Sequence, residues 1–197
     1  MRKMWIWLLL FAFLCPPAAS AAEVPPCIAL AVTGKGEGNL PERIAAQGAR
    51  ATFFPESGSW EQGRRILDAG HEIGLTAPEN WNFLSRRDVY RQLRARRMLL
   101  PPCQIRIVRP EGRVSDGVRQ VAEVQGMHIL GNALDPWAEA PAGRSLMERL
   151  KPGDILLLDG DDPELILNLI RVLQNQGYRL VTVSELHRLL GRGFDRG

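Results

Sequence analysis

Histidine, cysteine and lysine are all rare in this sequence, at three residues each among 197. Three cysteines are too few for a small fold held together by disulfides. Three histidines leave little material for a histidine-based metal site. The hydrophobic fraction of 45% and the charged fraction of 24% are ordinary for a globular protein, which excludes a disordered chain. We therefore expect one globular domain with a sizeable core.

One long apolar run stands at the N-terminus, from Met4 to Leu14, behind two basic residues. A membrane-spanning helix needs about 20 apolar residues, so this run is too short to be one. The small residues Ala18–Ala22 follow it, and the whole arrangement is typical of a secretory signal peptide. We expect residues 1–21 to be removed by cleavage after Ala21. The mature protein is then a single domain, residues 22–197, that is secreted or periplasmic and not stably inserted in a membrane.

No excess of either charge remains after the signal peptide. Residues 1–21 hold two of the 25 basic residues and none of the 22 acidic ones, which leaves a net charge of +1. Such a balance gives no reason to expect nucleic acid as a partner. The helical pattern at 85–100 is locally basic, with six arginines against Asp88. It is either a face for an anionic glycan, lipid or protein, or an ordinary solvated surface, and charge runs favour the second interpretation.

Short apolar runs alternate with helical patterns over residues 27–191, as they do in parallel βα units. The expected strands are Ile28–Thr33, Ala51–Phe54, Glu72–Leu75, Gln104–Arg109, Met127–Asn132, Asp154–Asp159 and Arg179–Val183. The expected helices are Leu40–Gln47, Ser59–Ala69, Ser85–Leu100, Ser115–Val124, Arg144–Leu150, Pro163–Gln176 and Ser184–Leu190. The expected N-caps are Ser85, Ser115 and Ser184, and the expected C-terminal stops are Gly70, Gly126 and Gly177. This pattern predicts an α/β fold, either a distorted (β/α) barrel of about seven parallel strands or a doubly wound open sheet. In both folds the chemistry is expected where the strands end.

Five stretches of the chain match a set of family motifs in order and spacing. They are Ala49–Phe54, Ala69–Gly74, Arg109–Gly112, Gly153–Leu158 and Gly177–Leu186. Together they resemble the polysaccharide deacetylases, the family that shares the NodB homology domain. The resemblance extends over nearly the whole mature chain. It implies a NodB-like distorted barrel of about seven βα units, in agreement with the number of expected strands.

The resemblance implies metal-assisted removal of acetyl groups from N-acetylated sugars, but the residues for this chemistry are replaced here. The family's aspartate pair, a general base and a metal ligand, corresponds to Thr33 and Gly34. The two metal-binding histidines correspond to Thr76 and Asn80, and the general-acid histidine to Asp159.

Threonine, glycine and asparagine supply neither the charge nor the basicity that a divalent metal needs. Without the metal, the pKa of a water molecule is not lowered, and no carboxylate remains to accept its proton. The sequence therefore predicts no metal at Gly34, Thr76 and Asn80, no other cofactor, and no deacetylation by the usual mechanism.

The three histidines do not restore the site. His71 lies in the retained Gly-His-Glu stretch and is expected to be structural. His128 stands at the start of a strand, the end of a barrel that does not carry catalysis, and His187 lies on the last helix.

Carboxylates are the better candidates. Asp159, Asp161 and Asp162 follow the sixth expected strand, Asp135 the fifth and Glu111 the fourth. In a closed barrel all five face one mouth, where they can divide acid and base roles or hold Ca²⁺ or Mg²⁺. The run Asp-Gly-Asp-Asp-Pro is also a good turn and helix start, and this simpler interpretation is favoured.

Three larger side chains are candidates for substrate binding. Arg109 matches the family arginine that orients the base, and here it can pair with Asp135, Asp159 or a ligand anion. Trp137 resembles part of the family's fourth motif, and Trp81 lies beside the second lost histidine. Each indole ring can stack on a sugar or pack in the core, and Arg109 can equally form an internal ion pair.

Two hypotheses for the function follow. In the first, the protein is a degenerate deacetylase homologue of the cell envelope that binds an N-acetylated polysaccharide or another envelope glycan, or supports an assembly with a protein partner. Its candidate substrate-binding residues are Arg109, Glu111, Asp135, Trp137 and Trp81. In the second, it is an active metal-independent or carboxylate-based hydrolase of acylated polysaccharide. Its candidate catalytic residues are Asp159, Asp135, Asp161 and Arg109.

The mature chain keeps two cysteines, Cys27 and Cys103, each after a Pro-Pro pair. In an oxidising compartment they either form a disulfide or remain thiols at strand starts, and the sequence leaves both possibilities open.

Overall fold

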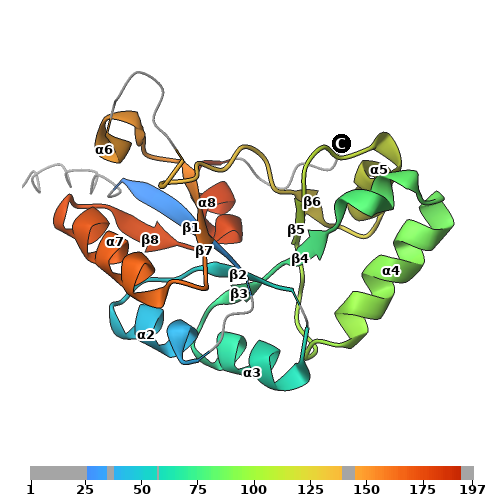
Figure 1. Ribbon diagram of the computed structural model, residues 1–197, viewed down its shortest axis with the longest axis horizontal. Coiled ribbons are helices and arrows are strands. Elements are labelled where there is room, and N and C mark those ends of the chain that lie inside the picture. Colours follow the sequence, from blue (N-terminus) through green and yellow to red (C-terminus); the bar gives the residue numbers. More distant parts are fainter. Residues whose placement is uncertain (1–25, 35–37, 57, 139–144, 192–197) are drawn as a thin grey trace, which may run out of the picture.

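The computed structural model in Figure 1 describes residues 26–34, 38–56, 58–138 and 145–191. The expected signal peptide lies outside these residues. The strands are β1 (Cys27–Gly34), β2 (Thr52–Pro55), β3 (Glu72–Ile73), β4 (Leu75–Ala77), β5 (Ile107–Pro110), β6 (His128–Ile129), β7 (Ile155–Asp159) and β8 (Arg179–Val181). The α-helices are α2 (Leu40–Ala46), α3 (Trp60–Asp68), α4 (Arg86–Met98), α5 (Asp116–Val124), α6 (Leu146–Arg149), α7 (Pro163–Asn175) and α8 (Val183–Leu189), with a 3₁₀ helix at Glu79–Phe83. None of the helices described here is long and apolar enough to span a bilayer.

All strand pairs are parallel, and they form two sheets. The first sheet has the order β3-β2-β1-β7, with β8 also paired to the start of β1, and the second has the order β4-β5-β6. After β6 the chain reaches β7 through an isolated parallel bridge between Leu134 and Leu156. The expected parallel α/β fold is thus confirmed, with its strands in two sheets instead of one continuous ring.

The strand expected at Glu72–Leu75 is divided by Gly74 into β3 and β4. The Gly74 N–H donates a hydrogen bond to the carbonyl oxygen of Phe53, at 2.8 Å. A Cβ atom at this position would lie within 3.0 Å of three ring carbons of Phe54. The backbone therefore approaches the buried Phe54 ring at the point where the chain passes from one sheet to the other.

Side chains of β1 alternate between two hydrophobic clusters, as expected for a strand buried on both faces. Ile28, Leu30 and Val32 belong to the larger cluster, which includes side chains from α2, α3, α4, α5 and α7. Cys27, Ala29 and Ala31 belong to a smaller cluster that joins both sheets and α8. Figure 1 shows α2, α3, α4 and α7 around the outside of the strands.

Most of the expected helix ends are confirmed. The side chains of Ser85 and Ser115 each accept a hydrogen bond from the backbone N–H three residues ahead. Gly70, Gly126 and Gly177 have φ angles of 81°, 69° and 84° and follow the ends of α3, α5 and α7.

The N-cap expected at Ser184 is wrong. Thr182 caps α8 instead by accepting a hydrogen bond from the N–H of Glu185, and Ser184 lies inside the first turn, where its hydroxyl donates to Glu72.

The two cysteines of the mature chain are thiols in the structure, without a disulfide between them. Cys27 is buried among the side chains of the smaller cluster, and Cys103 is partly buried against the larger one. Burial raises the pKa of the Cys103 thiol.

His71 has the structural role expected for it. Its Nε2 atom donates to the carbonyl oxygen of Pro41 at 2.7 Å, and its Nδ1 atom accepts from the N–H of Ala51 at 3.2 Å. Only a neutral ring with its proton on Nε2 satisfies both bonds. The ring thereby connects the start of α2, the start of β2 and the turn before β3.

Burial lowers the pKa of His71 below its usual 6.5, so protonation favours the unfolded chain. The stability that His71 provides is complete above about pH 6.5 and declines as the pH falls, by up to about 1.4 kcal/mol per pH unit. We expect His71→Gln to reduce the difference in free energy of unfolding between pH 7.5 and 5.5, measured by chemical denaturation. His128→Gln, at a less buried ring, should retain most of that difference. An unchanged pH dependence in His71→Gln would exclude this role.

Candidate functional site

The carboxyl ends of β1, β4, β5 and β7, with the loops that follow them, form the edge at which chemistry was expected; we call this edge the mouth. Thr33 at the end of β1 is in register with Asp159 at the end of β7. The Thr33 hydroxyl donates to the carbonyl oxygen of Leu158 at 3.2 Å. It is engaged with the backbone and does not replace a general base.

Gly34 has a φ angle of 97°, a conformation that residues with a side chain rarely adopt. A Cβ atom here would lie 3.1 Å from Oδ1 of Asp161 and 3.2 Å from Oδ1 of Asp159. The space of the family's metal-binding aspartate is thus bordered by two carboxylates of this chain.

These carboxylates hold a turn, as the simpler interpretation of Asp-Gly-Asp-Asp-Pro predicted. Oδ1 of Asp159 accepts a hydrogen bond from the N–H of Asp161 at 3.1 Å. Asp162 caps α7 by accepting from the N–H of Leu165 at 3.1 Å.

The other two family ligand positions are equally unsuited to a metal. Thr76 is buried in β4, and its hydroxyl has no hydrogen-bond partner. Asn80 is exposed on the 3₁₀ helix. In the described ranges, three or more histidine, cysteine, aspartate or glutamate side chains nowhere converge as metal ligands do. The residues present do not fit the family's metal. The five mouth carboxylates, which one interpretation of the sequence brought together around Ca²⁺ or Mg²⁺, form no such group among the residues that the structure describes.

Arg109 is largely enclosed, with 17% of its side chain exposed, on β5 opposite Thr76. Its ion pair is with Glu111, at a long 3.5 Å, and not with Asp135 or Asp159 as expected. The buried Nε atom of Arg109 has no hydrogen-bond partner. Burial lowers the pKa of the guanidinium, an effect that the nearby charges of Glu111 and Glu56 oppose. Arg109 is thus a largely enclosed cation whose charge is only partly neutralised by its one ion pair.

Trp137 and Asp135 lie together at the mouth. Oδ1 of Asp135 accepts hydrogen bonds from the N–H groups of Trp137, at 2.8 Å, and Ala138, at 3.2 Å. The indole remains 41% exposed. It borders a hollow of about 460 Å³, here called the Trp137 hollow, whose other lining residues are Thr33, Asp135, Leu157, Leu158, Asp159, Asp162 and Leu165.

A second hollow of about 390 Å³ lies on the other side of Leu157, and we call it the Arg109 hollow. Its lining includes Arg109, Arg119 on α5, and Asn132 in the loop after β6. Arg119 was not among the predicted site residues, because a single arginine on a helix has no distinguishing local pattern. Glu111 borders neither hollow and contributes to the mouth through Arg109 alone.

Trp81 does not reach either hollow. It is only 3% exposed, and the guanidinium carbon of Arg96 lies 5.3 Å from its ring centroid. Of the two roles predicted for Trp81, sugar stacking and core packing, the structure shows core packing. The basic helix α4 runs along the outer edge of the molecule in Figure 1, and there Arg91 pairs with Asp88 at 3.2 Å.

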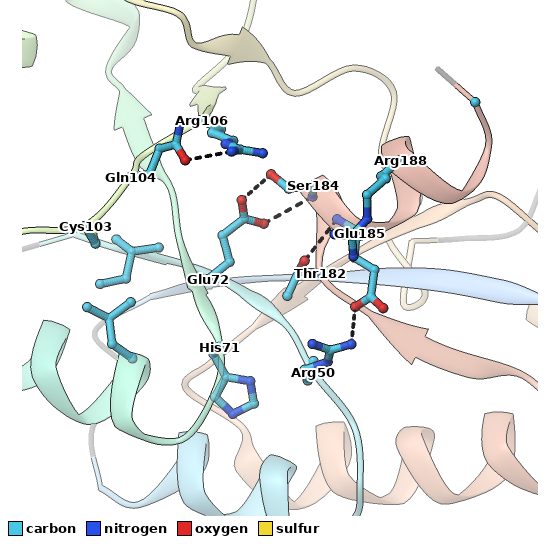
Figure 2. A pocket seen from close by; sticks show the side chains of 13 residues that line it. Arg50, His71, Glu72, Cys103, Gln104, Arg106, Thr182, Ser184, Glu185 and Arg188 are labelled. Atoms are coloured by element: carbon cyan, nitrogen blue, oxygen red, sulfur yellow. Dashed lines mark hydrogen bonds and ion pairs between the residues drawn. The ribbon is translucent and has the colours of Figure 1, made fainter. Parts of the chain in front are cut away.

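A hollow of about 540 Å³ lies at the opposite end of the strands (Figure 2). Its two carboxylates are satisfied within the protein. Glu72 accepts from the N–H of Ser184 at 3.2 Å and also from its hydroxyl. Glu185 forms ion pairs of 2.5 Å with both Arg50 and Arg179. These contacts hold the start of α8 against the strands.

No protein-family model and no curated protein matches the sequence, but several solved structures share the fold. The peptidoglycan deacetylase PdaC from Bacillus subtilis matches with a TM-score of 0.68 and 21% identity, over 85% of this chain and 93% of that one. A family 4 carbohydrate esterase from Streptomyces lividans matches with a TM-score of 0.61 and 18% identity, over 79% and 91%. BA3943 from Bacillus anthracis, described as a pseudoenzyme of carbohydrate esterase family 4, matches with a TM-score of 0.64 and 25% identity, over 87% and 66%. The resemblance to polysaccharide deacetylases is therefore confirmed in the fold.

Proposed function

Because the chain has the fold of the polysaccharide deacetylases without their metal ligands, we propose that it is an exported, non-catalytic glycan-binding protein of the cell envelope. The observation that carries this proposal is the mouth itself. The aspartate position of the metal site is a glycine bordered by Asp159 and Asp161, whereas an exposed indole borders a hollow beside it.

The geometry supports the absence of catalysis. Asp135, Asp159 and Asp162 each accept backbone N–H hydrogen bonds that shape their own loops. A general base needs a carboxylate oriented toward a water molecule or substrate, with a pKa suited to proton transfer. Of the other two carboxylates at the mouth, Glu111 pairs with Arg109, and Asp161 lies with Asp159 beside Gly34. A pseudoenzyme of this fold already exists in BA3943, as its description states.

The Trp137 hollow has the properties of a sugar site. Its size is within the range of about 300–1,000 Å³ that is usual for small-ligand sites. The indole ring and the side chains of Leu157 and Leu165 offer apolar surfaces to the C–H faces of a pyranose. Free carboxylate lone pairs of Asp135 and Asp159 can accept hydrogen bonds from sugar hydroxyls. The N-terminal sequence, with its expected cleavage after Ala21, would bring this site to envelope glycans.

Calorimetric titration with N-acetylglucosamine trisaccharide tests the proposal. We expect binding without acetate release, and at least a tenfold loss of affinity in Trp137→Ala, because the stacking surface is removed. Trp60→Ala is the matched control, since Trp60 at the start of α3 is 55% exposed and lines neither hollow. Equal affinity losses in the two variants, or no binding of any tested glycan by the unmodified protein, would contradict a glycan site at Trp137.

A further inference from the structure

The Arg109 hollow has an unusual distribution of charge. Its lining carries two guanidinium groups, from Arg109 and Arg119, and the amide of Asn132. No carboxylate is among the described residues that line it. The neighbouring Trp137 hollow, by contrast, is lined by Asp135, Asp159 and Asp162. The mouth is thus divided into an acidic half and a basic half.

Arg109 is incompletely paired within the protein. Its contact with Glu111, at 3.5 Å, is longer than the ion pairs of other partly exposed arginines, such as Arg43 with Glu164 at 2.6 Å. The Nε atom is buried without an acceptor. Native structures seldom leave a buried donor unsatisfied, and a charged donor least of all. The long contact with Glu111 leaves the outer N–H groups of the guanidinium as donors for an anion in the hollow.

The surroundings suit an anionic group that is attached to a sugar ring. Ile129, Val114 and Leu157 give the hollow apolar walls, and Asn132 can bond a hydroxyl. A guanidinium presents parallel N–H donors that match two oxygens of a carboxylate or phosphate. Leu157 lines both hollows, so adjacent sugars of one chain can occupy them together.

We infer that the glycan bound at the mouth is anionic, and that Arg109 and Arg119 bind its carboxylate or phosphate group in the Arg109 hollow. This inference rests on the proposed function and narrows its ligand class. A neutral sugar occupies the Trp137 hollow, and the charged sugar next to it occupies the basic half of the mouth.

Paired probes test the charge directly. Trigalacturonate is compared with its methyl ester, which has the same rings without the charge, and N-acetylglucosamine 6-phosphate with N-acetylglucosamine. We expect at least one anionic probe to bind ten times or more tighter than its neutral counterpart, with an affinity that falls as salt is added. The pair that shows the preference identifies carboxylate or phosphate as the recognised group. Equal affinities within both pairs would overturn the inference and leave the proposed function standing. If none of the four probes binds, the inference fails, and the titration with N-acetylglucosamine trisaccharide decides the proposed function.

Substitutions of the arginines test whether the preference for anionic probes arises in the Arg109 hollow. Arg109→Gln and Arg119→Gln should each reduce the preference for the anionic probe, which is the ratio of its affinity to that of its neutral counterpart, by about tenfold. Arg94→Gln removes the same charge from α4, outside the hollow, and should leave the preference unchanged. Arg109→Lys keeps the charge but loses the paired donors, so an intermediate preference is expected. Melting temperatures verify that each variant is folded. A preference that persists in both Arg109 variants would refute the assignment.

Discussion

Gly74→Ala is expected to lower the free energy of unfolding by about 3 kcal/mol, the upper range for overpacking a core. The added methyl group would lie within 3.0 Å of three carbons of the Phe54 ring, which is only 1% exposed. Neither partner can move easily. Gly74 is held by the hydrogen bond from its N–H to Phe53, and Phe54 is packed among side chains of both sheets.

Chemical denaturation of Gly74→Ala and Gly117→Ala measures this effect against a matched control. Gly117 lies in α5, and a methyl group there would find only ordinary contacts, at 3.7 Å or more. Since alanine favours helix, Gly117→Ala should be more stable than the unmodified protein by about 0.5–1 kcal/mol. Similar stabilities of the two variants would show that the junction between β3 and β4 is not the close contact described here.

Gly34→Asp, which returns an aspartate to the family's ligand position, is expected to destabilise the protein by about 2–4 kcal/mol in the presence of a chelator. Part of the loss comes from the φ angle of 97°, and part from a third negative charge beside Asp159 and Asp161. Deacetylase activity should not return, because Thr76 and Asn80 still provide no imidazole.

Gly34→Asn separates the two causes, since asparagine has the same shape without the charge. It should lose only the conformational part, about 1–2 kcal/mol. The difference between the two variants should shrink as salt is added, because dissolved ions screen the repulsion between exposed charges. Equal stabilities of the two variants at pH 7 would mean that Asp159 and Asp161 do not repel a negative charge at position 34.

A described variant of the pseudoenzyme BA3943 has restored enzymatic activity. In the present chain, a side chain introduced at Gly34 would lie close to the carboxylates of Asp159 and Asp161. The loop after β7 has filled the place of the missing ligand, with the N–H of Gly160 bonded to the carbonyl oxygen of Thr33 at 2.8 Å.

The local pattern predicted most of the secondary structure, because β1 is apolar along most of its length and the described α-helices begin at a serine cap or end before a glycine with positive φ. Contacts between distant parts of the chain explain the errors. Gly74 divides a strand because of the Phe54 ring, 20 residues earlier. The serine at position 184 is an N-cap by pattern, but its hydroxyl bonds Glu72, 112 residues away.

The site was predictable in what it lacks and less so in what it contains. The loss of the metal ligands is visible in the letters at positions 34, 76 and 80. The sequence offered no reason to prefer Trp137 over Trp81 as a sugar-binding residue. Trp81 is 3% exposed because Arg96 and the core cover it, whereas Trp137 is 41% exposed. The pairing of Arg109 with Glu111 depends on the bend of the chain after β5, which no local pattern reveals.

Whether this deacetylase fold binds glycan without metal chemistry can be decided by one titration series. Chelator-treated protein is titrated with Zn²⁺, Co²⁺, Mg²⁺ and Ca²⁺ by calorimetry, and each sample is then assayed for acetate release from N-acetylglucosamine oligomers. The expected result is no stoichiometric metal binding and no acetate, while an oligomer still raises the melting temperature. Stoichiometric metal binding with acetate release that is lost in Asp159→Asn would contradict the account and establish an active, rebuilt site.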